Sequence, residues 1–180
     1  MTRGCFYKDD GYVEWKNGEQ SVKVSQRDIV IAHPHERNSV MIISKEEGSS
    51  VCSLYDLNGT MLLEYKQNGH ILDTAKGQLS FSENVYHAEY DELHRSYVIM
   101  LEENGCHTIS FEHEDNIKDL KKLVIPDSYE AEYLMCFEGS VSVVLRALIE
   151  ENCDQYGRSD WRFKINYDSR TLEKENIIGK

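Results

Sequence analysis

Histidines and carboxylates are the residues of this sequence whose spacing could support metal binding or acid–base chemistry. His33 and His35 flank Pro34, and this i, i+2 spacing would place both imidazoles on one face of a strand. Such a pair can ligate a metal when a carboxylate converges on it. Because proline cannot donate to a strand ladder, we interpret His33-Pro34-His35 as a solvated turn and predict no metal there.

A second set of candidates follows later in the chain. His87, Glu89 and Asp91 alternate along one expected strand face, and His94 comes shortly after them. This set could form a hydrolytic or metal cluster. The sequence contains no Gly-rich phosphate loop, no GxSxG elbow, no HExxH and no DxDxDG calcium loop, and Gly139-Ser140 is its nearest approach to a serine motif. We therefore predict no catalytic residues, no cofactor and no enzyme activity.

The elements that would position these residues recur along the chain. Three apolar runs each end in a pair of glutamates near a turn, namely Glu46-Glu47, Glu102-Glu103 and Glu150-Glu151. An aromatic residue directly before an acid then follows at steps of 56 residues, at Tyr55, Phe111 and Tyr167. Such self-similarity indicates one supersecondary unit used several times, because each unit must stack on its neighbour to bury its apolar face.

Periodicity and turn residues define the expected secondary structure. Residues 161–168 alternate between apolar and polar side chains, which predicts a strand with one buried face. Asp10-Gly11 and Asn58-Gly59 accept positive φ and predict hairpin turns. Pro126 fits a further turn.

Two segments have composition that also suits a helix. Residues 115–124 combine a three-residue apolar spacing with late lysines, so helix and strand both stay open for them. Residues 143–152 contain good helix formers. The repeat favours a strand there, because the equivalent runs are rich in β-branched and aromatic residues.

These elements predict an all-β fold of consecutive antiparallel hairpins, in a single domain over residues 1–180. Three four-stranded meander units would cover residues 27–68, 83–125 and 131–178, preceded by a half-unit at the amino terminus. The units resemble β-propeller blades in length and in their acidic hairpin turns, although no family is identified by this. A β-sandwich is the alternative, and closure by a second copy would make a homo-oligomer.

Composition restricts the partner and the compartment. The chain of 180 residues has a formal net charge of −12, which disfavours nucleic acid and anionic membranes as partners. Its apolar stretches are too short for a membrane helix, and no signal-like core is found near residue 1, so we expect a cytoplasmic protein. Five cysteines without a CxxC pair argue against a disulfide framework or a structural zinc site. The last twenty residues are an exception to the acidic composition, because basic side chains outnumber acids there.

Stacked repeats would gather the acidic turns at one rim. We therefore predict a non-enzymatic domain that binds a basic protein partner, such as an inhibitor or immunity protein against a cationic nuclease-type toxin. The partner-binding candidates are the paired glutamates and one tyrosine in a polar loop: Glu46, Glu47, Glu102, Glu103, Glu150, Glu151 and Tyr156. Acidic turns that serve only solubility would explain the same pattern. A carbohydrate-binding module or a small β-barrel hydrolase is the alternative from another class.

Overall fold

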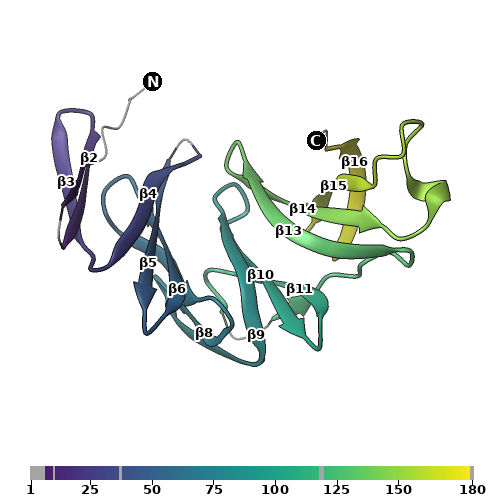
Figure 1. Cartoon of the computed structure of the whole chain (residues 1–180), viewed down its shortest axis with the longest axis horizontal. Helices are drawn as coiled ribbons and strands as arrows, with labels where there is room; N and C mark the ends of the chain where they lie inside the picture. Colours follow the sequence, from purple (N-terminus) through teal and green to yellow (C-terminus); the bar gives the residue numbers. More distant parts are fainter. Residues whose placement is uncertain (1–6, 10, 37, 118–119, 179–180) are drawn as a thin grey trace. The chain divides into compact units, whose positions relative to one another are not determined.

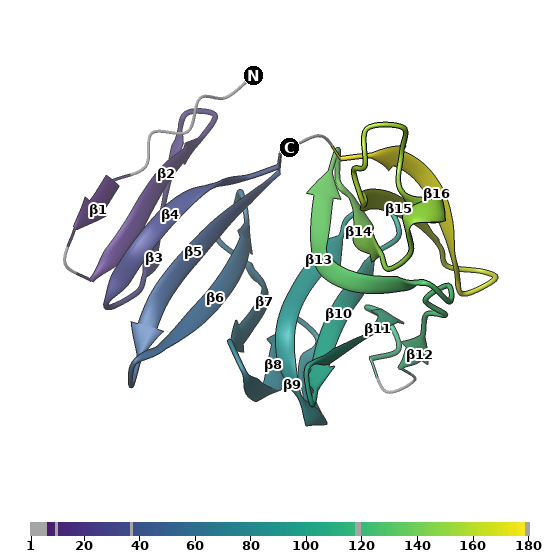
Figure 2. The ribbon, with the colours of Figure 1, turned by 45° about the vertical axis from the view of Figure 1, so that its right-hand side comes forward.

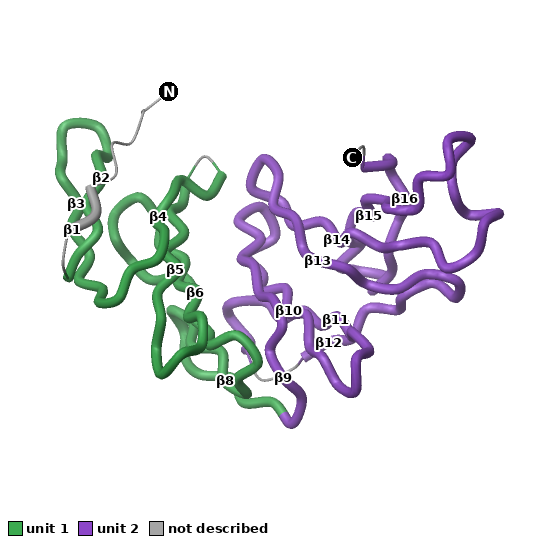
Figure 3. The backbone as a smooth tube through the Cα atoms, in the orientation of Figure 1, with its two compact units in different colours: residues 1–81 green, residues 82–180 purple. Residues whose placement is uncertain are grey.

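The computed structural model describes residues 7–9, 11–36, 38–117 and 120–178. The chain divides into two compact units, residues 1–81 (unit 1) and 82–180 (unit 2), drawn in separate colours in Figure 3. The predicted all-β fold is confirmed, because the described residues form strands β1 to β16, one short 3-10 helix and no α-helix. Folding as one domain stays a prediction.

Unit 1 consists of hairpins that follow one another along the chain (Figure 1). Strands β1 to β3 form an antiparallel sheet, and β4 to β8 pair in sequence order. The bounds are β1 (Tyr7–Asp9), β2 (Tyr12–Asn17), β3 (Gln20–Ser25), β4 (Ile29–His35), β5 (Ser39–Glu46), β6 (Ser49–Asp56), β7 (Met61–Lys66) and β8 (Gly69–Thr74). The hairpins predicted at Asp10-Gly11 and Asn58-Gly59 are confirmed, since β1 pairs with β2 and β6 with β7. Asp10 itself lies outside the described residues.

Trp15 belongs to a buried hydrophobic cluster of unit 1. It is 1% exposed, and its ring centroid lies 6.5 Å from that of Tyr55 on β6. Its indole Nε1 donates to the backbone oxygen of Leu57 at 2.9 Å, in the turn between β6 and β7. Alternating apolar residues of β2 and β3 thus pack on β4 to β6 and form one cluster with Val40 and Ile42.

Gly59 lies in the same turn. A larger residue fits at this position only if the neighbouring side chain of Val22 moves. Its φ is +87°, and a Cβ added there would be 2.8 Å from Cγ1 of Val22 on β3. We expect Gly59→Ala to lower the free energy of unfolding of unit 1 by about 1–3 kcal/mol. Hydrogen exchange of amides in β2 and β6 measures this loss.

Gly18→Ala is the matched control, because Gly18 has φ +63° with no atom within 4 Å of an added Cβ. It should cost about 1 kcal/mol, from backbone strain alone. Equal losses in the two variants would contradict a restraining contact between Gly59 and Val22.

Unit 2 contains two antiparallel meanders, which Figure 2 shows from a second side. Strands β9 to β12 belong to the nine-stranded sheet that runs from β4 to β12, and β13 to β16 form a separate sheet. Strand β9 begins in unit 1 and continues into unit 2. The bounds are β9 (Gly77–Asp91), β10 (Ser96–Glu103), β11 (Cys106–His113), β12 (Lys121–Lys122), β13 (Tyr129–Phe137), β14 (Ser140–Ala147), the 3-10 helix η1 (Glu150–Asn152), β15 (Asp160–Asn166) and β16 (Thr171–Ile177). The two meanders share a core in which Met100 and Phe111 pack with Val143 and Phe163.

The strand groups match the predicted units in outline. Strands β4 to β7, β9 to β12 and β13 to β16 correspond to residues 27–68, 83–125 and 131–178, with β8 as an additional strand and β9 starting earlier than expected. The sheets are open, and they establish neither a propeller nor a sandwich.

Most local predictions hold. The alternation over residues 161–168 is confirmed, since Phe163 and Ile165 of β15 are each 2% exposed. The strand favoured within residues 143–152 is also confirmed through Ala147, and η1 follows it. Residues 115–124 hold turns and β12, while positions 118 and 119 lie outside the described residues. Pro126 accepts a hydrogen bond from Tyr129 N across a turn, as expected.

The turn predicted at His33-Pro34-His35 is wrong, because all three residues belong to β4. Among the described strands, β4 is the last in its sheet order and pairs with β5 alone. A proline is tolerated there because an edge strand leaves one side without a ladder partner. The two imidazole centroids are 6.4 Å apart.

Candidate functional site

The first acidic turn belongs to unit 1. Glu46 ends β5, and Glu47-Gly48 form the two-residue turn to β6 with φ values of 48° and 84°. Both φ values are positive, as this tight hairpin turn requires. The two glutamates are exposed, and Nζ of Lys66 lies 3.5 Å from a carboxylate oxygen of each. Lys66 therefore compensates part of the charge of this pair.

The other two acidic pairs lie in unit 2, each two residues along the chain from a residue that lines one cavity. Glu102 and Glu103 end β10, and Glu150 and Glu151 form most of η1. The cavity has a volume of about 470 Å³ and is lined by residues from the β10–β11 turn, from the start of β13 and from the segment after β14, including Gly105, His107, Asp127, Glu130 and Leu148.

Glu102 has a structural role that sequence reasoning missed. Its carboxylate accepts a hydrogen bond from Gly105 N at 2.6 Å and another from the Asn84 side chain at 3.2 Å. These bonds, the backbone one first, hold the pKa of Glu102 below its usual value. Glu102 thus closes its own turn, whereas Glu103, Glu150 and Glu151 are exposed.

Exposed apolar side chains lie in the same connection as the glutamates of η1. Leu148 is 57% exposed, Ile149 43% and Tyr156 75%, all within the connection between β14 and β15. Trp161 Nε1 anchors this connection by donating to the backbone oxygen of Asn152 at 2.9 Å. We refer to Leu148, Ile149, Glu150, Glu151 and Tyr156 as the β14–β15 surface. The exposed position of Tyr156 agrees with its prediction, whereas Leu148 and Ile149 were missed because they continue an apolar strand pattern.

Asp91 forms a saturated network at the other end of unit 2, where the β9–β10 and β13–β14 turns meet (Figure 1). It is 0% exposed, and its Oδ1 accepts from the backbone N and the Nδ1 of His94, both at 2.9 Å. Its Oδ2 accepts from Val141 N at 2.8 Å, from the Tyr167 hydroxyl at 2.6 Å and from Ser140 Oγ at 3.3 Å. A carboxylate has about four acceptor positions. Asp91 therefore joins three chain segments, and its acceptor positions are taken by protein donors.

Tyr167 and His94 complete this network. Burial raises the pKa of Tyr167, and the charge and hydrogen bond of Asp91 raise it further, so the hydroxyl stays a donor. The His94 ring stacks on Tyr167 with centroids 4.4 Å apart. Tyr55 and Phe111 lie within strands β6 and β11. Tyr167 lies just beyond the end of β15, so it is not equivalent to them.

His87 and Glu89 bind each other and do not converge on Asp91. Leu134 N donates to Nδ1 of His87 at 3.3 Å, so Nε2 carries the proton and donates to Glu89 Oε1 at 3.2 Å. His87 thereby ties β9 to β13. The part of the chain that the structure describes contains no cluster of three potential metal ligands.

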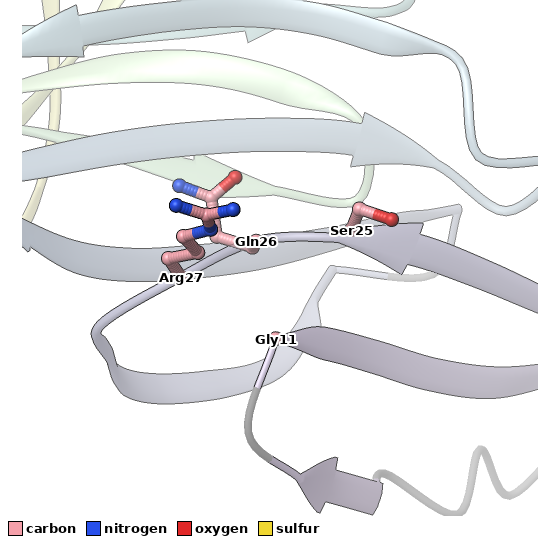
Figure 4. A pocket seen from close by; sticks show the side chains of 4 residues that line it. All are labelled: Gly11, Ser25, Gln26 and Arg27. Carbon is pink, nitrogen blue, oxygen red and sulfur yellow. The ribbon is translucent and has the colours of Figure 1, made fainter.

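A hollow of about 500 Å³ lies in unit 1 beside the end of β3, lined by Gly11, Ser25, Gln26 and Arg27 (Figure 4). Gln26 Nε2 donates to Ser44 Oγ at 2.9 Å, so this side chain is engaged within the unit. Arg27 is the single charged residue among the described lining residues. The hollow therefore brings no reactive groups together.

Comparison with known proteins gives no relative from which a function could be transferred. No protein-family model, no curated protein and no solved structure matches the chain. Within the described residues, no helix has the length and apolar character needed to cross a bilayer.

Proposed function

We propose that this protein is a binding domain that engages a basic protein partner through the β14–β15 surface. The observation that carries the proposal is the placement of exposed Leu148, Ile149 and Tyr156 beside exposed Glu150 and Glu151. Protein interfaces commonly combine an apolar centre with a polar rim, and aromatic anchors contribute much of the affinity. Single exposed apolar residues are ordinary, whereas this one connection exposes three.

Charge supports a basic partner. The net charge of −12 attracts a cationic protein over long range and accelerates its association. The cavity that Leu148 lines adds Asp127 and Glu130, and exposed Glu103 lies two residues before Gly105, which also lines it. An inhibitor or immunity protein against a cationic toxin is the member of this class that we propose first, acting in the cytoplasm.

The hydrolase alternative has weaker support. A catalytic carboxylate must have an oxygen or proton available to substrate. Asp91 is buried, and both its oxygens accept hydrogen bonds from neighbouring segments. This arrangement favours a role in stability.

The test compares two charge-matched variants. Glu103→Gln/Glu150→Gln/Glu151→Gln removes three charges from the rim, and Glu19→Gln/Glu46→Gln/Glu47→Gln removes three exposed charges from unit 1. A partner captured from native lysate is identified, purified and assayed by stopped-flow. We expect the unit 2 variant to slow association by roughly tenfold at low salt, with little change in dissociation.

Two outcomes would refute the proposal at different points. Equal slowing by both variants would mean that net charge acts without this surface. An acidic partner, or association independent of salt, would exclude the electrostatic mechanism. Sedimentation of the wild type, run alongside, tests the homo-oligomer alternative.

A further inference from the structure

A second cavity in unit 2 lies away from the β14–β15 surface. It has a volume of about 340 Å³, within the range of small-molecule sites. Its walls are the β9–β10 turn, the β13–β14 turn and one face of β14 to β16, and its lining residues are Leu93, His94, Phe137, Glu138, Ser140, Ser142, Arg162, Lys164 and Glu175. We call it the β15 cavity. It lies at the start of β14, whereas the β14–β15 surface follows the end of that strand.

Charges in the lining of the β15 cavity balance. Arg162 and Lys164 supply two cations, and Glu138 and Glu175 supply two carboxylates. Such a lining selects neither an anion nor a cation strongly. It does offer strong donors beside strong acceptors, and Ser140 and Ser142 can act as either. A ligand with hydroxyl groups, each of which can donate and accept a hydrogen bond, can pair with both the donors and the acceptors of this lining.

Arg162 is held in place by an ion pair with Glu175 and by a neighbouring ring. Its Nε lies 2.9 Å from Glu175 Oε2, but the N–H does not point at that oxygen closely enough for a hydrogen bond. The guanidinium carbon lies 5.7 Å from the ring centroid of Phe137. Charge and stacking thus orient the planar group at the wall of the cavity.

Apolar surface lies next to these polar groups. Phe137 is 54% exposed and Leu93 67%. The face of an aromatic ring carries partial negative charge, which attracts polarised C–H groups. The ring of a sugar presents such C–H groups on one face and hydroxyls around its edge.

The wall formed by Leu93 and His94 is rigid. Both Glu92 N and Leu93 N donate to the Gly139 oxygen, at 2.9 and 3.1 Å, which ties the two turns together. His94 is fixed by Asp91 through Nδ1, so its Nε2 is the ring nitrogen that remains for the cavity. A preformed wall lowers the entropic cost of binding.

We propose that the β15 cavity binds a neutral, polyhydroxylated ligand of monosaccharide size. The balanced charges match hydroxyl groups, and Phe137 with Leu93 matches the apolar face of a sugar ring. This site is separate from the proposed partner-binding surface, and either can fail without the other.

The test is a titration of the ¹⁵N-labelled full chain with glucose, galactose, mannose and N-acetylglucosamine, followed by amide chemical shifts. We expect saturable shifts with millimolar affinity at Leu93, Gly139, Ser142 and Lys164 for at least one sugar. Phe137→Ala should weaken that binding by roughly tenfold. The matched control is Tyr133→Ala, because Tyr133 is an exposed aromatic on the same strand, 37% exposed and outside the lining.

Three results would overturn the proposal. The first is the absence of saturable shifts with every sugar in the panel. The second is equal weakening by Phe137→Ala and Tyr133→Ala, which would place the site elsewhere. The third is far tighter binding of glucose 6-phosphate or gluconate than of glucose, because a balanced lining should not prefer an anion.

Discussion

Replacing Asp91 with alanine is expected to lower the free energy of unfolding of unit 2 by about 4 kcal/mol. The substitution removes the acceptor of Val141 N, of the Tyr167 hydroxyl and of two His94 nitrogens at once. Each buried donor that loses its partner costs about 1–3 kcal/mol, and packing can relax only in part. Hydrogen exchange of amides in β10 and β14 measures the loss in unit 2.

Asp168→Ala is the control for this substitution, because Asp168 is an exposed aspartate of the same unit. It should change stability by less than about 0.5 kcal/mol. Tyr167→Phe removes one donor and keeps the ring, so we expect a loss of about 1 kcal/mol. If Asp91→Ala costs no more than Tyr167→Phe, the network does not hold the three segments together.

Replacing Trp15 with alanine is expected to cost unit 1 about 3–5 kcal/mol. Trp15 is 1% exposed and joins β2 to the β6–β7 turn through both its ring and its Nε1 hydrogen bond. Its removal leaves a large cavity and an acceptor at Leu57 without its donor. Amide exchange in β5 and β6 reports the change.

Trp15→Phe separates packing from hydrogen bonding. It keeps most of the apolar area and loses the bond to Leu57, so about 1–2 kcal/mol should be lost. Tyr12→Ala is the matched control, since Tyr12 lies on β2 but is only half-buried. A loss in Tyr12→Ala as large as that in Trp15→Ala would contradict the assignment of Trp15 as a major packing residue of this cluster.

Local pattern predicted most of the strands and turns. The alternation in β15 and the Asn58-Gly59 turn depend on neighbours in sequence, so one sequence sufficed for them. Pro34 was misassigned because its tolerance depends on β4 being an edge strand, which is a property of the sheet and not of the segment.

The site was harder to predict, because its chemistry depends on distant residues. Asp91 looked like a candidate for catalysis, and its partners Val141 and Tyr167 lie 50 and 76 residues further along the chain. From the sequence, Glu102 was a candidate for partner binding at the acidic rim. In the structure its carboxylate accepts hydrogen bonds from Gly105 N and the Asn84 side chain. The polar loop around Tyr156 predicted that this side chain is exposed. The apolar run of residues 143–149 did not show that β14 ends at Ala147 and that Leu148 and Ile149 beyond it are exposed.

The long sequence separation between Asp91 and Tyr167 affects when unit 2 can fold during synthesis on the ribosome. At 5–20 residues per second, the 76 residues from Asp91 to Tyr167 take roughly 4–15 s to translate. For that interval Asp91 has its two His94 donors, but its most distant donor, the Tyr167 hydroxyl, does not yet exist. In unit 1, by contrast, the hydrogen bond from Trp15 to Leu57 spans 42 residues. Vectorial synthesis therefore favours an order in which unit 1 matures first and the second half of the chain closes only after β15 has left the exit tunnel.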